Sequence, residues 1–176
     1  PSLCEELFFP NQGSPVTPPH NSSDFRWKDY GAAVWRYLRE SYNCDPGDYM
    51  LSICGNEALR ELSSPGKSGS IFYISHDDQF MIKSMKKEEM KLLCSILPQY
   101  YRHMTAYRDT LVPKFYGLHR INKPSKGRRV RFVVMSNIFD TTLPIHRRFD
   151  LKGSTVGRQN SGSLDKAQAE ELAAAA

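Results

Sequence analysis

The sequence contains no apolar run long enough to span a membrane. A spanning helix needs about 20 consecutive apolar residues, whereas charged residues make up 24% of this chain and only 40% is hydrophobic. No signal-type apolar segment lies near its start. We therefore expect a cytoplasmic protein with enough apolar material for one core.

The chain also lacks the cysteine and histidine spacings that bind metals. No two of its four cysteines form a C-x-x-C pair, and its five histidines show no metal-ligand spacing. Reduced thiols and packing or surface histidines are the simpler interpretation. We expect no metal site among these residues: Cys4, Cys44, Cys54, Cys94, His20, His76, His103, His119 and His146.

Neither familiar phosphate-binding glycine motif is present. The P-loop needs a glycine at position 61, which is Glu, and the kinase motif G-x-G-x-x-G is replaced by Gly66-x-x-Gly69. A Gly- and Ser-rich turn nevertheless precedes a strand-like run at 71–74. Such a turn lets backbone N–H groups approach phosphates closely, although many turns of this kind only connect strands.

The order of the elements after this turn favours a phosphate site. A second strand-like run ends at Lys83, and a helix-like segment follows, with Glu88 and Glu89 in its first turn. Kinases place a phosphate cover, a lysine and a partner glutamate in this order. The alternative is that Lys83 is an ordinary strand lysine with its amine in solvent.

The remaining patterns predict an α+β fold, with an antiparallel sheet and helices packed against it. Residues 1–24 are rich in Pro, Gly and Ser and indicate a linker or disordered tail. The amphipathic segment 28–42 predicts a helix that packs on the sheet or pairs two copies of the chain. The further expected elements are a short helix at 57–62, strands at 70–75 and 79–85, a helix at 87–106 with a break possible at Pro98, a hairpin of 114–121 with 128–137, and a strand at 145–151.

The segment Asp150-Leu151-Lys152-Gly153-Ser154, after an Arg-rich lead-in, resembles the signature of the phosphatidylinositol-phosphate kinase family. The similarity covers about residues 25–158 and is closest to the plant-type phosphatidylinositol 4-phosphate 5-kinases. Further matching segments lie at 48–55, 65–73, 80–83, 97–101, 114–118 and 132–135.

This resemblance implies the amino-terminal lobe of a lipid-kinase fold over residues 25–158. It implies that Lys83 and Lys152 are catalytic cations that hold the phosphates of ATP, and that Glu89 orients Lys83. Positive charge around the transferred phosphoryl group is what such catalysis needs. The other nucleotide-binding residues that it implies are Gly66, Lys67, Ser68, Gly69 and Asp150.

Positive charge is concentrated in the second half of the chain. The net charge is +5, and residues 120–158 carry ten Lys and Arg against two Asp. Such a cluster attracts phosphoinositides and anionic membranes, and Arg147 and Arg148 are the best candidates to face them. A solvated charged surface is the alternative. Aromatic residues are not interleaved with the basic ones, which argues against nucleic acid.

Residues 159–176 read as a low-complexity or helical tail and carry no acidic catalytic motif. In the family, the residues that hold Mg²⁺ and position the attacking hydroxyl lie further downstream. We therefore expect this chain to supply the ATP-binding lobe of a phosphatidylinositol 4-phosphate 5-kinase, peripheral at the plasma membrane, and to be inactive alone. The alternative is a non-catalytic module that binds phosphoinositide membranes or a kinase partner.

Overall fold

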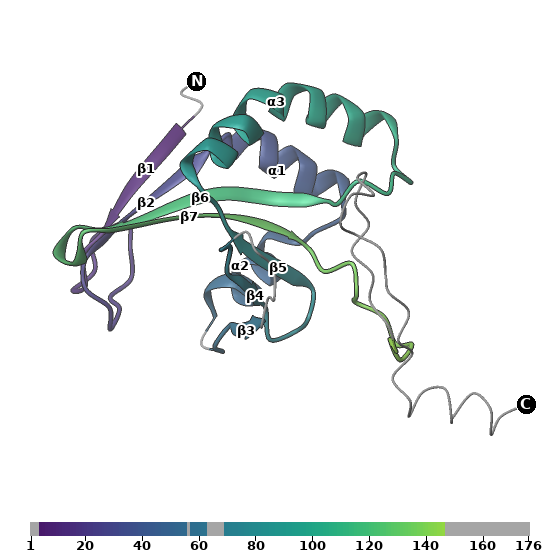
Figure 1. Cartoon of the computed structure of the whole chain (residues 1–176). Coiled ribbons are helices and arrows are strands. Elements are labelled where there is room, and N and C mark those ends of the chain that lie inside the picture. The colour runs from purple at the N-terminus through teal and green to yellow at the C-terminus, as the bar shows by residue number, and fades with distance from the viewer. Residues whose placement is uncertain (1–3, 56, 63–68, 147–176) are drawn as a thin grey trace, which may run out of the picture. The chain divides into compact units, whose positions relative to one another are not determined.

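The computed structural model describes residues 4–55, 57–62 and 69–146, in which seven strands form one sheet of order β1-β2-β6-β7-β5-β4-β3 (Figure 1). Every pair of neighbouring strands is antiparallel. The chain divides into two units, residues 1–140 and 141–176, and the sheet lies in the first. The strands are β1 Cys4–Phe9, β2 Phe25–Tyr30, β3 Arg60–Leu62, β4 Phe72–Ile74, β5 Phe80–Ser84, β6 Phe115–Lys123 and β7 Arg128–Ser136. The helices are α1 Ala32–Ser41, α2 Pro46–Cys54 and α3 Lys87–Ala106, with a 3-10 turn at Pro124–Lys126. The predicted α+β class is confirmed.

The long hairpin of β6 and β7 forms the centre of the sheet. Leu118 lies opposite Val133, and the register continues to Lys123 opposite Arg128. Gly127 closes the turn with φ of 58°, a left-handed conformation that glycine adopts without strain. The predicted hairpin is therefore confirmed, and it brings the basic residues near its tip onto paired positions.

Helices α1 and α3 cover one face of the sheet (Figure 1). Leu118 and Val133 project into this layer, where Leu38 and Leu118 have no exposed surface. The Trp35 indole donates a hydrogen bond to the Tyr30 carbonyl at 2.6 Å, which satisfies its only polar atom in the core. The buried residues of this first core are Trp35, Leu38, Met90, Leu93, Leu97, Tyr100, Met104, Leu118 and Val133.

Helix α2 covers the opposite face and encloses a second core. Phe132 and Val134 alternate with Val133 along β7, so successive side chains enter different cores. The sequence run Phe132–Val134 is apolar throughout because β7 is buried on both faces. The buried residues of this second core are Tyr49, Phe80, Ile82, Phe132 and Val134.

The structure corrects the amino-terminal part of the sequence prediction. The helix expected at 28–42 begins only at Ala32, because Phe25–Tyr30 forms β2. Gly31, with φ of 71°, separates strand from helix. Trp27 therefore lies on a strand, whereas Trp35 lies on α1 as expected. The sequence did not reveal this boundary because Tyr30, Val34 and Leu38 are spaced four residues apart, as in a helix. Tyr30 continues this helical pattern by coincidence, although it is the last residue of a strand.

Two further segments differ from the prediction. Within residues 1–24, expected to be a linker or tail, Cys4–Phe9 forms the edge strand β1 and pairs with β2 along its whole length. The expected helix at 57–62 is replaced by the short strand β3 at its end. Helix α2 was not predicted, because Pro46 and Gly47 read as helix breakers; Pro46 instead occupies the first helical turn, where it is tolerated.

Helix α3 runs without interruption through Pro98, so the possible break is absent. Ile145 and His146 are not in a strand, and the rest of the strand expected at 145–151 lies outside the described residues, as does the tail at 159–176. Across the described ranges, no helix has the length and apolarity that a membrane span requires. The domain boundaries at 25 and 158 stay a prediction.

Candidate nucleotide-binding site

Lys83 lies near the end of β5, directly opposite Val133 of β7. Because strand side chains alternate, Ile82 enters the α2 core while Lys83 shares the other face with Val133 and α3. Only 27% of the Lys83 side chain is exposed. Its stem is therefore held against the sheet, and it does not extend freely into solvent.

The Lys83 amine lies 3.3 Å from the Glu89 carboxylate on α3. Glu89 also accepts a hydrogen bond at 2.7 Å from the backbone N–H of Lys86, the residue that caps the helix. This hydrogen bond, with the nearby Lys83 charge, keeps the pKa of Glu89 below its usual value. Glu89 is therefore fixed at one end by the helix start and presents its other oxygen to Lys83.

The short connection between β5 and α3 explains this geometry. Met85 donates its backbone N–H to the Arg131 carbonyl at 2.8 Å, which continues the sheet pairing up to the helix cap. The strand thus passes directly into the helix, and the third helical residue, Glu89, faces back toward Lys83. Glu88 is exposed, whereas Glu89 is the residue that contacts the Lys83 amine. The structure therefore selects Glu89 over Glu88 as the partner.

Of the predicted glycine turn, only Gly69 lies among the described residues. Its φ of 68° is left-handed, and a Cβ placed there would meet no atom within 4 Å. The backbone conformation, not lack of space, therefore favours glycine. Two residues later, the Ile71 N–H donates to the Ser84 hydroxyl at 2.8 Å and ties this segment to the end of β5.

The other predicted site residues lie outside the described residues. These are Gly66, Lys67, Ser68, Arg147, Arg148, Asp150 and Lys152. Their roles toward ATP, lipid or membrane stay predictions.

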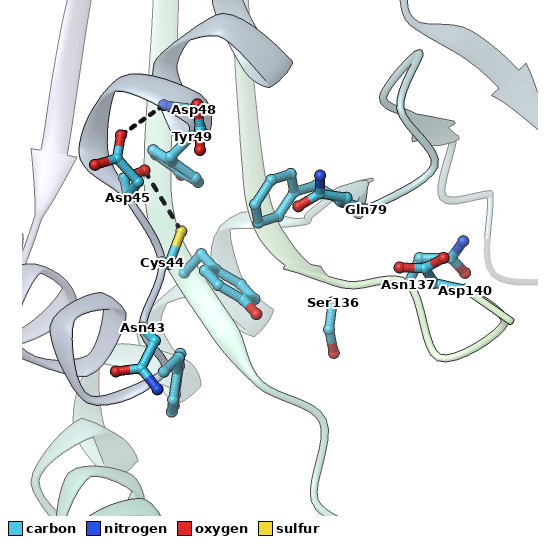
Figure 2. Close-up of a pocket in the computed structure, with 12 residues that line it drawn as sticks. Asn43, Cys44, Asp45, Asp48, Tyr49, Gln79, Ser136, Asn137 and Asp140 are labelled. Atoms are coloured by element: carbon cyan, nitrogen blue, oxygen red, sulfur yellow. Dashed lines mark hydrogen bonds between the residues drawn. The ribbon is translucent and has the colours of Figure 1, made fainter.

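A pocket of about 280 Å³ lies on the other face of the sheet (Figure 2). Phe80 and Ser136, which face each other across β5 and β7, line it on the α2 side. Neither Lys83 nor Glu89 belongs to its lining. The complete lining is Tyr42, Asn43, Cys44, Asp45, Asp48, Tyr49, Gln79, Phe80, Tyr116, Ser136, Asn137 and Asp140.

The chemistry of this pocket does not suit a triphosphate. Three aspartates and no lysine or arginine are among its lining residues, so a polyanion would be repelled. Asp45 is already used as a helix cap, accepting the backbone N–H groups of Gly47 and Asp48. Figure 2 shows Asp45 and Asp48 together at the start of α2. We therefore place the candidate nucleotide site at Lys83 and not in this pocket.

The sequence did not reveal a polar network beneath α2. His119 Nδ1 lies 2.5 Å from the Asp29 carboxylate, and the Trp27 indole donates to the same oxygen at 2.6 Å. The Tyr49 hydroxyl reaches His119 Nε2 at 3.5 Å. Burial raises the pKa of Asp29, but the hydrogen bonds from His119 and Trp27 outweigh it and hold that pKa below its usual value. The expectation that His119 is a packing residue agrees with this structural role.

No group of three His, Cys, Asp or Glu side chains within the described ranges could hold a metal ion.

An antiparallel sheet in which a strand lysine pairs with a glutamate on the following helix is the arrangement found in the amino-terminal lobe of kinases. The model of the family "Phosphatidylinositol-4-phosphate 5-Kinase" matches residues 53–173. The chain therefore belongs to the phosphatidylinositol-4-phosphate 5-kinase family.

Individual relatives agree with this assignment. The chain is 59% identical to phosphatidylinositol 4-phosphate 5-kinase 9 of Arabidopsis thaliana over 94% of its own length. It is 60% identical to kinase 8 of the same plant over 86% of its length. Kinase 1 of Oryza sativa subsp. japonica is 56% identical over 87% of the chain. In each case, the chain spans about 20% of the relative's length.

Proposed function

We propose that this chain forms the ATP-binding lobe of a kinase that phosphorylates a phosphatidylinositol phosphate headgroup. Its relatives are named phosphatidylinositol 4-phosphate 5-kinases, and we propose the same substrate here. The observation that carries the proposal is the contact between Lys83 and Glu89. A half-buried amine that is oriented by a carboxylate is suited to bind phosphate oxygens.

Within this proposal, each site residue has a distinct task. Lys83 binds the α- and β-phosphates, and Glu89 holds the amine in place. Gly66 to Gly69 cover the phosphates with backbone N–H groups. Lys152 adds a second cation with Asp150 as its local partner, and Arg147 and Arg148 contact the lipid phosphate or the membrane.

We further propose that the protein works in the cytoplasm at the plasma membrane surface. Support comes from the positive charge between residues 120 and 158, because anionic lipids attract basic segments by about 1 kcal/mol per residue near the surface. Pairing of two copies through the amino-terminal lobe belongs to the same proposal. Mg²⁺ would accompany ATP and would be held by residues outside the described part of this chain.

Nucleotide binding by the purified chain tests the proposal. Lys83→Ala should weaken ATP binding, measured by calorimetry, by on the order of tenfold or more, since a charge-assisted phosphate contact is worth about 1.5–3 kcal/mol. Lys91→Ala is the matched control, because Lys91 is an exposed lysine on the outer side of α3. Equal affinity for ATP in the wild type and in Lys83→Ala would refute the site.

A non-catalytic module that binds anionic membranes is the second candidate, favoured by the same basic charge. Liposome binding that ignores ATP, survives Lys83→Ala and weakens with salt would support it. ATP binding that depends on Lys83 would support the kinase lobe instead. The two measurements use one preparation of the protein and distinguish the candidates directly.

A further inference from the structure

Four charged residues from four strands form one row across the sheet. Glu6 of β1 lies opposite Lys28 of β2, Lys28 opposite Arg120 of β6, and Arg120 opposite Arg131 of β7. Directly opposite residues in an antiparallel pair share a face. Arg120 is two positions from Leu118, so the row lies on the face that carries α1 and α3.

Arg120 and Arg131, hereafter the arginine pair, place two positive charges at directly opposite positions. Their Cβ atoms are therefore about 4.5–5.5 Å apart, and like charges in this arrangement destabilise a sheet. Glu6 offsets only part of the charge. It lies 3.3 Å from the Arg120 guanidinium and 3.9 Å from the Lys28 amine, so the row retains an excess of two positive charges.

The arginine pair also contains unsatisfied donors. Within the described ranges, two buried side-chain nitrogen or oxygen atoms lack a hydrogen-bond partner, and they are Nε of Arg120 and Nε of Arg131. A buried polar atom without a partner is costly, and in a native protein it calls for an explanation such as a bound ion or water. That both atoms belong to one cross-strand pair indicates a shared ligand.

The chemistry of that ligand follows from the donors. A guanidinium binds a tetrahedral phosphate through two parallel N–H groups, and Nε with one Nη provides such a pair. About 20% of the Arg120 side chain is exposed, whereas its Nε is buried. One phosphate could accept bonds from both arginines and remove their mutual repulsion. Chloride or a carboxylate would use fewer of these donors.

We propose that the arginine pair is an accessory phosphate-binding site, separate from the candidate ATP site at Lys83. Its ligand is a phosphomonoester, carried either by a lipid headgroup or by a soluble molecule. The next row on the same face is centred on Asn122 of β6, which lies opposite Arg26 of β2 on one side and opposite Arg129 of β7 on the other. They extend the positive surface toward a ligand with more than one phosphate.

Thermal unfolding of the 176-residue chain tests this site. Sodium phosphate should raise the midpoint above that in sodium chloride of equal ionic strength, because a ligand that binds the native state stabilises it. Phosphate also stabilises proteins without binding, so the decisive quantity is the difference between variants. The rise should persist in Lys83→Ala and be lost in Arg120→Gln and Arg131→Gln.

Arg102→Gln provides the matched control, since Arg102 is exposed on α3 away from the row. This variant should respond to phosphate as the wild type does. The same rise in Arg131→Gln as in the wild type, or no rise in the wild type, would overturn the proposal. If the arginine variants fail to fold, Nε–H resonances of the wild type provide a second readout: shifts at Arg120 and Arg131 during phosphate titration support the site, and unchanged resonances refute it.

Vesicles distinguish the two possible sources of the phosphate. Phosphatidylcholine vesicles with a phosphatidylinositol phosphate should retain the wild type more strongly than Arg131→Gln if the ligand is a lipid, and a soluble inositol phosphate should compete. If the vesicles retain the wild type and Arg131→Gln equally, while phosphate in solution still raises the unfolding midpoint of the wild type, the site belongs to a soluble phosphomonoester. Failure of ATP binding at Lys83 would leave all these outcomes unchanged, because they use no nucleotide.

Discussion

Gly117 shows how one missing side chain permits a polar network. A Cβ at this position would meet the His119 ring at Nε2 and lie 3.0 Å from the Tyr49 hydroxyl. The close approach of α2 and β6 therefore requires glycine, whose φ here is not left-handed. Steric exclusion, not backbone freedom, is the reason for this residue.

We expect Gly117→Ala to destabilise the protein by about 1–3 kcal/mol, the usual effect of overpacking. Urea unfolding would measure this loss. The same change made in a His119→Ala background should lose less, because the ring it meets is gone. An equal loss in both backgrounds would contradict the steric explanation.

The lowered pKa of Asp29 predicts that the free energy of unfolding decreases in acid. Its pKa in the folded protein is lowered, so folding is favoured when the carboxylate is charged, above the unfolded value of about 3.9. The stabilisation should disappear as pH falls through the lower folded pKa. Urea unfolding between about pH 6 and pH 2 should therefore show a smaller acid loss in Asp29→Asn than in the wild type.

Glu40→Gln serves as the comparison for this measurement, since Glu40 is an exposed carboxylate on α1. Its acid profile should follow the wild type. Identical profiles for Asp29→Asn and the wild type would remove Asp29 as a source of acid sensitivity.

At the scale of elements, α2 depends on its first residues. Asp45 accepts N–H groups of Gly47 at 2.7 Å and Asp48 at 3.0 Å, which satisfies two donors at the helix start. We expect Asp45→Ala to lower the unfolding free energy by about 1 kcal/mol. Glu40→Ala in α1 is the control with little expected effect. A loss no larger than the control's, measured by urea unfolding, would show that the cap contributes nothing.

Elements with a clear period could be predicted from the sequence. The hairpin of β6 and β7 and helix α3 were found because their apolar spacing matches one structure over many residues. Lys83 and Glu89 were found for a related reason: they are six residues apart on consecutive elements, so local order was enough to propose their contact.

Features that depend on distant pairing could not be predicted. β1 reads as a tail because only its pairing with β2 makes it a strand. Asp29 and His119 are 90 residues apart, and their contact exists only after β2 and β6 align. The arginine pair was visible as charge in the sequence, but its opposite positions and unpartnered Nε atoms follow from the register of β6 and β7.

At the scale of the whole sheet, stability should vary from centre to edge. β6 and β7 are central, and β7 is buried on both faces at Phe132–Val134, whereas all three residues of the edge strand β3 are exposed. Native-state hydrogen exchange should therefore show the slowest amides in β6 and β7 and fast exchange in β3. Protection of β3 equal to that of β7 would contradict this order.

Val133 and Val134 are adjacent in the chain but serve separate interiors, since the first faces α1 and α3 and the second faces α2. Within the described residues, the two cores therefore have no buried side chain in common. Among relatives, compensating replacements should occur within one core and seldom across the sheet. We therefore expect the buried residues of each core to vary largely independently, and the run Phe132–Val134 between them to vary least.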